Sequence, residues 1–331
     1  MKHRSAAVLV LTVAMLLTSL GLTEDGWGQT KIPRVGILSF DLGLTGDQVK
    51  QWWEPFRRPL AEQGWIDGQT VSFEYSSART DPSRFAEAAA ELVQLKVDVI
   101  FAESAPATRA AFAATRTTPI VAIDLTNDPV AAGYAESYGR PGGNVTGIFL
   151  DAPEFASKWL ELLHVIVPGL SRVAVLWDPS PGATHLQAVQ SAARSFRVQL
   201  QVLEVHKPED IDRAFSAFRG HPQALIILPS PMIYAQSERL AKLALRHRLP
   251  ATSMARLFAE SGGVLSYGPD QASSHERGAL LVAKILGGAK PGDLPVERPT
   301  KFDFILNLKS AKVLGLAVPD SVLVRADKVI R

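Results

Sequence analysis

The order of short apolar segments and amphipathic helices constrains this chain more than any other feature of its sequence. Residues 33–38 form a short apolar run of the kind found in buried parallel strands. Residues 48–63 then predict a helix, and residues 71–75 alternate in polarity as a strand does. Two more helices, each followed by an apolar strand (97–102 and 119–123), continue the series. This alternation predicts an α/β fold with a doubly wound parallel sheet.

The same order begins again after the breaker stretch at residues 141–144. The second set of predicted strands covers residues 145–149, 172–177, 200–205, 224–228, 249–253 and 264–267, and most are separated by amphipathic helical patterns. The chain therefore predicts two similar α/β lobes, one after the other.

The final third contains too few elements for another domain. It predicts a helix at 273–286, a strand at 301–306 and a helix at 308–314. We expect these elements to return to the first lobe. The predicted division is therefore residues 30–147 with 270–331 as the first lobe and 148–269 as the second. Several chain crossings between lobes are suited to a multi-segment hinge.

The N-terminus has the three parts of a secretory signal peptide. Lys2, His3 and Arg4 precede a charge-free run over residues 6–22, and acidic residues follow at 24–25. The run is short for a spanning helix, which needs about 20 apolar residues. Residues 1–29 are therefore predicted to be a cleaved signal peptide, and the alternative is an uncleaved signal anchor. We expect an exported protein.

Composition removes several classes of function. Lysine and arginine total 35 and aspartate and glutamate total 33, which leaves a formal net charge of +2 and predicts no nucleic-acid partner. The chain has no cysteine, so disulfides, thiolate metal ligands and a cysteine nucleophile are excluded.

Known catalytic and cofactor motifs are missing from the sequence. No glycine-rich dinucleotide or phosphate loop and no Gly-x-Ser-x-Gly turn is found. Asp124 and Asp128 lie four residues apart, but Asp128 precedes Pro129, as the N-cap of a helix does. The histidines beyond residue 3 are scattered, and we expect all of them to be ordinary surface or edge residues. No enzyme activity, cofactor or metal site is therefore predicted.

Polar and aromatic residues follow the predicted strands, where a parallel sheet binds its ligands. The candidate ligand-binding residues are Ser39, Phe40, Ser104, Ala105, Asp124 and Asp128 in the first lobe, and Trp177, Ser180, Ser230, Met254 and Tyr267 in the second. Ser104 precedes a helix start, so we expect its hydroxyl to bind an anionic ligand group there. Phe40, Trp177 and Tyr267 are expected to form an aromatic wall. The pattern favours a small polar or zwitterionic ligand in a cleft between the lobes.

Several motifs resemble those of the substrate-binding proteins of ABC transporters. They lie at residues 128–130, 140–147, 262–268, 284–291, 294–302, 307–312 and 325–327. The resemblance implies a type I periplasmic-binding-protein fold and an exported monomer that delivers a small molecule, such as an amino acid or related carboxylate, to an ABC permease. Characterised members include binders of aromatic amino acids. A periplasmic sensor for a membrane receptor and a secreted α/β enzyme are the alternatives.

Two departures from this family's usual pattern affect the expected ligand and location. Many members carry Gly-Thr-Pro after the third strand, where this chain has Glu103-Ser104-Ala105-Pro106. The added carboxylate of Glu103 predicts a ligand other than an ordinary amino acid. Many members are lipoproteins, and this chain has no cysteine to carry a lipid. A free protein retained near its transporter implies a periplasm.

Overall fold

The computed structural model describes residues 32–41, 46–78, 81–150 and 153–331. The predicted signal peptide at residues 1–29 lies outside these residues. Residues Pro33–Arg331 form one structural unit, and this unit contains both of the sheets described below.

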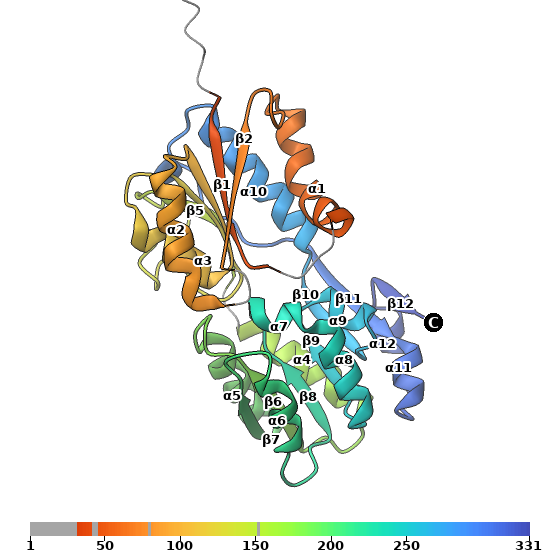
Figure 1. Ribbon diagram of the computed structural model, residues 1–331. Coiled ribbons are helices and arrows are strands. Elements are labelled where there is room, and N and C mark those ends of the chain that lie inside the picture. The colour runs from red at the N-terminus through yellow and green to blue at the C-terminus, as the bar shows by residue number, and fades with distance from the viewer. Residues whose placement is uncertain (1–31, 42–45, 79–80, 151–152) are drawn as a thin grey trace, which may run out of the picture. The chain divides into compact units, whose positions relative to one another are not determined.

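The first sheet is parallel throughout and has five strands in the order β2-β1-β3-β4-β5. The strands are β1 (Arg34–Ser39), β2 (Ser72–Ser77), β3 (Val99–Glu103), β4 (Ile120–Asp124) and β5 (Val145–Phe149). Helices α1 (Gly46–Glu62) and α10 (Gln271–Leu286) cover one face, and α2 (Phe85–Gln94) and α3 (Ala105–Ala114) cover the other (Figure 1). The 3₁₀ turn η1 (Pro82–Arg84) contacts α2, and the turn η2 (Pro291–Asp293) contacts β5.

Both faces of the first sheet are buried, which explains its nearly continuous apolar strands. Along β3, Val99 and Phe101 pack toward α1 and α10, whereas Ile100 and Ala102 pack toward α2 and α3. Gly147 in β5 has a φ of 144°, and a Cβ added there would lie 2.1 Å from the carbonyl oxygen of Ala122. Only glycine allows β5 to approach β4 this closely.

The second sheet has seven strands in the order β12-β11-β10-β9-β8-β6-β7. The strands are β6 (Arg172–Trp177), β7 (Gln199–Glu204), β8 (Ala224–Ile227), β9 (Ala251–Ser253), β10 (Leu265–Pro269), β11 (Phe302–Asn307) and β12 (Lys328–Ile330). The helices that follow or surround them are α4 (Pro153–Ile166), α5 (Thr184–Phe196), α6 (Asp210–Ser216), α7 (Pro231–Ala235), α8 (Ser237–Arg246), α9 (Arg256–Glu260), α11 (Leu308–Val313) and α12 (Asp320–Leu323). All neighbours are parallel except β10 and β11.

The assignment of the chain beyond residue 286 to the first lobe is wrong for its strands. Helix α10 does pack on the first sheet, but β11 pairs with β10 and β12 pairs with β11 in the second sheet. The apolar side chains of Phe304 and Leu306 join the core formed by α4 and β6. Burial of these side chains explains why β11 extends the second sheet.

The chain passes between the two sheets three times: after β5, after β10 and before β11. Backbone hydrogen bonds hold the crossing segments side by side. Glu297 N–H donates to Gly147 O at 2.9 Å, Phe149 N–H donates to Glu297 O at 2.9 Å, and Asp270 N–H donates to Lys301 O at 3.0 Å. The predicted fold of two α/β lobes with a multi-segment hinge is therefore confirmed.

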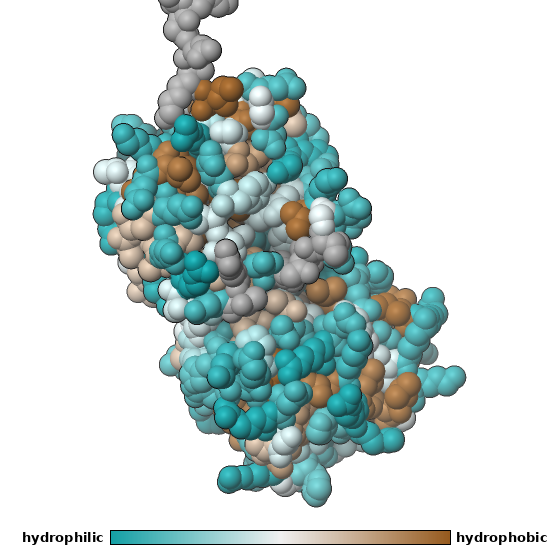
Figure 2. All heavy atoms as spheres, in the orientation of Figure 1, coloured by the Kyte–Doolittle hydropathy of each residue, from teal (hydrophilic) through white to brown (hydrophobic). Residues whose placement is uncertain are grey.

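The visible surface is mainly hydrophilic, with scattered hydrophobic side chains (Figure 2). Within the described ranges, no helix combines the length and the apolar character that crossing a bilayer requires.

Candidate functional site

A cavity of about 360 Å³ lies between the carboxyl ends of the strands of the two lobes. The first lobe contributes the ends of β1, β3 and β4 together with α1 and the start of α10. The second lobe contributes the segments after β8 and β9 and the start of β11. Its size is within the range of about 300–1,000 Å³ that is typical of small-molecule sites.

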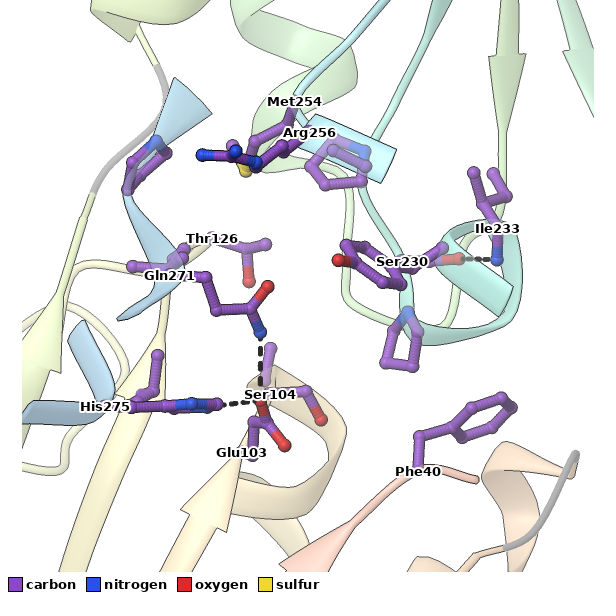
Figure 3. A pocket seen from close by; sticks show the side chains of 18 of the residues that line it. Phe40, Glu103, Ser104, Thr126, Ser230, Ile233, Met254, Arg256, Gln271 and His275 are labelled. Atoms are coloured by element: carbon purple, nitrogen blue, oxygen red, sulfur yellow. Dashed lines mark hydrogen bonds and ion pairs between the residues drawn. The ribbon is translucent and has the colours of Figure 1, made fainter. Parts of the chain in front are cut away.

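Five of the residues proposed from the sequence line this cavity: Phe40, Ser104, Ala105, Ser230 and Met254. Figure 3 labels all of them except Ala105. Each of them directly follows a strand or lies at the start of the next helix, where Ser230 is the N-cap of α7. These positions agree with the general rule that ligands bind beyond the carboxyl ends of parallel strands.

The two aspartates proposed for the site stabilise their own loops and do not line the cavity. Asp124 is fully buried and accepts hydrogen bonds from Thr126 and Asn127. Burial raises the pKa of Asp124, although these hydrogen bonds oppose the shift. Asp128 caps a turn by accepting from the N–H groups of Val130 and Ala131. Burial raises the pKa of Asp128, but these hydrogen bonds outweigh it and leave the pKa below its usual value.

Four other proposed residues also lie outside the lining. Ser39 ends β1, where its carbonyl accepts from Ala78 N–H. Trp177 donates from Nε1 to Gly182 O, and the Ser180 hydroxyl donates to Asp178. The Tyr267 ring packs between aromatic side chains, stacked on Phe302 at 6.2 Å and tilted against Phe155 at 5.8 Å. The expected aromatic wall of Trp177 and Tyr267 is therefore wrong, because both side chains pack against the core of the second lobe.

Ser104 connects β3 to α3 in a strained backbone conformation. Its φ is 122°, a region that disfavours every residue except glycine. The side chain caps the helix by accepting from Ala107 N–H at 3.4 Å, and the Ser104 carbonyl accepts from Thr108 N–H. Pro106 has no N–H, so Ala105 N–H and the Ser104 hydroxyl proton are the donors left for a ligand at this helix start.

Glu103 is held by two side chains of α10. Its Oε1 accepts from Gln271 Nε2 at 3.0 Å and lies 2.7 Å from His275 Nε2 (Figure 3). The His275 ring is 1% exposed and stacks on Trp53 with centroids 5.3 Å apart. The expectation that every scattered histidine is a surface or edge residue is therefore wrong for His275, because α10 returns to the first lobe and buries it.

Aromatic side chains from both lobes meet beside this carboxylate. Trp52 of α1 contacts Tyr234 of α7 edge to face, with centroids 5.5 Å apart, and also contacts His275 at 5.6 Å. Burial raises the pKa of Tyr234, and the negative charges of Glu103 and Glu260 raise it further. The phenol of Tyr234 therefore stays neutral at physiological pH.

The second lobe closes the opposite side of the cavity with short capped segments. Ser230 accepts from Ile233 N–H at 3.0 Å and begins the five-residue helix α7. Arg256 donates from Nε to Glu260 at 3.0 Å and from Nη1 to Asp303 at 3.4 Å. Burial raises the pKa of Asp303, and the negative charge of nearby Asp270 adds to the effect.

Two hydrogen-bonded contacts connect the lobes beside the cavity. Arg109 of α3 donates to the carbonyl oxygens of Ser180 and Pro181 at 3.3–3.4 Å. His185 of α5 is buried, and its Nε2 lies 3.0 Å from Leu125 O. Burial lowers the pKa of His185 to about 4, so its ring is neutral and Nε2 carries the proton. The surface position predicted for His185 is also wrong.

Several of the residues that sequence reasoning missed lie on helices, although others, such as Thr126 and Asp270, lie just after strands. Trp52, Gln271, His275 and Arg256 all line the cavity. A signal was present for Glu103, which was recognised as an added charge next to Ser104. The helical residues gave no such signal, since their positions depend on which sheet face each helix covers.

The lobes, the hinge and the cavity define a two-lobed ligand-binding protein of the type I periplasmic class. Among the described residues, no group of three or more histidines and carboxylates is arranged to hold a metal ion. A family model described as "ABC transporter substrate binding protein" matches residues 38–330. The chain belongs to this family.

Several known proteins are similar to the chain over most of its length. A tyrosine-binding protein of Clostridioides difficile is 26% identical over 265 residues, which are 79% of this chain and 75% of that protein. The crystal structure of a conserved domain protein from Vibrio cholerae is 25% identical, with a TM-score of 0.82 over 90% of this chain and 100% of the other. A domain from Streptococcus pneumoniae in complex with L-Trp is 24% identical, with a TM-score of 0.80 over 90% and 99%.

Proposed function

We propose that this protein is an extracytoplasmic solute-binding protein that delivers a small molecule to an ABC importer. The observation that carries the proposal is a single cavity whose walls come from both lobes at the carboxyl ends of their strands. Such a cavity binds a molecule that both lobes contact together, which is the requirement for capture by closure. Membership of the family supports delivery to a permease.

Closure of the cleft is the proposed mechanism. Trp52–Tyr234, Arg109–Ser180 and His185–Leu125 are contacts between residues of different lobes. A ligand that fills the cavity adds further contacts to both lobes and so stabilises the closed state by its differential affinity. A permease can then distinguish the loaded protein from the empty one.

Phe40, Ser104, Ala105, Ser230 and Met254 are the ligand-binding residues that we retain from the sequence. To these the cavity adds Trp52, Glu103, Tyr234, Arg256 and His275. The aromatic rings of Phe40, Trp52 and Tyr234 suit a flat apolar part of a ligand. Relatives named for tyrosine and L-Trp support an aromatic amino acid or a related compound as the starting candidate.

The proposed location is the periplasm, after removal of residues 1–29 as a signal peptide, with the mature chain a free monomer. Fusion of residues 1–30 to a reporter tests this part. Export with a shortened N-terminus supports the proposal, and a full-length product in the inner membrane supports a signal anchor.

A thermal-shift screen of amino acids, their derivatives, small organic acids and purines tests the binding function. A true ligand at 100 times its Kd adds about 2.7 kcal/mol of stability. Small-angle scattering at saturation should then show a smaller radius of gyration, and mass spectrometry should recover the ligand unchanged. A deletion strain that keeps normal uptake of the ligand but loses a transcriptional response to it would instead indicate a sensor.

A further inference from the structure

We propose that the ligand carries a net positive charge and that Glu103, held in place by His275 and Gln271, binds its cationic nitrogen. This inference rests on the proposed function, because it concerns the same cavity. The expected ligand is an aromatic amine or an aromatic amino acid whose carboxyl group is blocked. The inference excludes the free zwitterionic amino acid as the preferred ligand.

The first support is the charge of the described cavity lining. Three carboxylates, Glu103, Asp270 and Asp303, face one guanidinium, that of Arg256. Arg256 already binds two carboxylates, Glu260 at 3.0 Å and Asp303 at 3.4 Å. A ligand carboxylate would therefore compete with Asp303 and Glu260 for this cation and would face two further acids. Such like-charge contacts are unfavourable.

The second support is the pairing of Glu103. Both side-chain bonds that it accepts from described residues reach Oε1, from Gln271 at 3.0 Å and from His275 at 2.7 Å. These bonds fix the carboxylate in one orientation and leave Oε2 for a ligand. Since a carboxylate only accepts, Gln271 must direct its Nε2 toward Glu103. Its own carbonyl oxygen is then available as a second acceptor for the ligand.

The third support is the small number of anion donors at the helix starts. At α3, Ala107 N–H is taken by Ser104, and Pro106 has no N–H to offer. At α10, Asp270 caps the helix by accepting from Ser273 N–H at 2.7 Å, so a carboxylate already occupies this end of the dipole. The helix starts are therefore largely compensated within the protein.

The aromatic rings complete the site for a cation attached to a flat group. Trp52 packs edge-on against His275 at 5.6 Å, directly beside the carboxylate that His275 binds. Trp52 and Tyr234 contact each other at 5.5 Å. A ligand ring lying against them directs an amine three bonds from the ring, as in aromatic amines and amino acid amides, toward Glu103. The faces of the two rings favour a cation as well.

Matched acids and amides test the proposal by titration calorimetry. The probes are L-tryptophan with L-tryptophanamide, L-tyrosine with L-tyrosinamide, and L-phenylalanine with L-phenylalaninamide, together with tryptamine and tyramine. Each amide has nearly the shape of its acid but lacks the negative charge. We expect at least one amide or amine to bind at least about 10-fold more tightly than its matched acid. Acids that bind as tightly as their amides would overturn the inference while leaving the binding function intact.

Variants separate the role of Glu103 from a general change of charge. Glu103→Gln should weaken binding of the preferred cationic probe by about 10-fold or more, the effect of one charge-assisted hydrogen bond. It should reduce the preference for amide over acid as well. Glu276→Gln is the control, because Glu276 lies next to His275 on α10 but pairs with Arg58 away from the cavity. An equal loss in both variants, or no loss in Glu103→Gln, would overturn the role of Glu103.

The same panel distinguishes failure of the inference from failure of the proposed function. Binding of an organic acid or a purine with no binding of any cationic probe would reject the ligand class and support a binding protein of another specificity. A panel in which no compound of any charge binds or shifts the melting temperature would reject both.

Discussion

The two walls of the cavity are built in different ways. In the first lobe, Glu103 is held by side chains 168 and 172 residues away in the sequence. In the second lobe, Ser230 and Ser253 bond to backbone N–H groups only three and two residues away. The first wall at Glu103 therefore depends on contacts between distant parts of the chain, whereas these two serines of the second wall stabilise local turns. We infer that the first wall sets which charge is accepted and that the second completes the enclosure.

Among the variants considered, removal of His275 should lower the stability most, because His275 makes the long-range contact that holds Glu103 in the first wall. His275→Ala takes away the hydrogen bond to Glu103 and leaves space beside Trp53 and Phe101. We expect a loss of about 3–4 kcal/mol in the free energy of unfolding, measured in urea. The matched control is His164→Ala, an exposed site in α4, which should change stability by less than about 0.5 kcal/mol. Similar losses for the two variants would mean that the first wall does not depend on this long-range contact.

The contact of His185 with Leu125 joins the two lobes and should make stability depend on pH. The pKa of His185 is lowered from 6.5 to about 4 by burial, so above pH 6.5 the ring is neutral in both the folded and the unfolded chain. Between pH 6.5 and 4 the unfolded chain binds a proton that the folded chain does not. Stability should therefore fall over this range by up to about 3 kcal/mol.

Comparison with His185→Gln isolates this contribution from other titrating groups. The glutamine amide can still donate to Leu125 O but does not titrate. Urea unfolding between pH 4 and 7.5 should show a smaller loss of stability on acidification in the variant. If stability falls equally with pH in the two proteins, His185 is not the source of the pH dependence.

Substitution of Ser104, at the strained turn in the first wall, should cause a smaller loss of stability. Ser104→Ala loses the cap and keeps the positive φ, so it should lose about 1–2 kcal/mol. Ser104→Gly also loses the hydroxyl, but glycine adopts this backbone conformation freely, so the loss should be only a few tenths of a kcal/mol. Thermal unfolding of both variants tests whether the glycine variant is the more stable of the two. A glycine variant less stable than the alanine variant would exclude backbone strain at this position.

The weakest expected effect concerns the ring contact between the walls. Trp52 and Tyr234 meet edge to face at 5.5 Å, a geometry that is favourable by about 0.5–1 kcal/mol beyond the area buried. A double-mutant cycle with Trp52→Ala and Tyr234→Ala, measured by unfolding, should give a coupling energy of this size. Additive effects would show that the two rings do not stabilise one another across the cavity.

The features that could be predicted from the sequence are those set by a local pattern of residues, namely individual strands and the serines that precede helices. Strands 145–149 and 172–177 agree fully with β5 and β6, because a short apolar run between turn residues identifies a buried strand without reference to its partners. Ser104 and Ser230 were identified for the same reason, since each stands directly before a helix that has a proline among its first two residues.

The features that could not be predicted, such as the sheet that the C-terminal strands join, depend on contacts between distant segments of the chain. No local pattern indicates that β11 prefers the edge of β10 or that α10 packs against α1. For this reason the C-terminal strands were placed in the wrong lobe and His275 was taken for a surface residue. Sequence reasoning therefore missed Gln271 and His275, which long-range packing brings to Glu103 in the first wall.

The late position of α10 and β11 in the chain has a consequence for synthesis. A ribosome releases β1 to β5 well before α10, and β10 before its antiparallel neighbour β11. Until then part of the apolar face with Phe101 and Val121 is uncovered, and one edge of β10 is unpaired. Neither lobe can complete its native packing while residues beyond 300 are still being added. The native packing of both lobes therefore becomes possible only when nearly the whole chain has been synthesised.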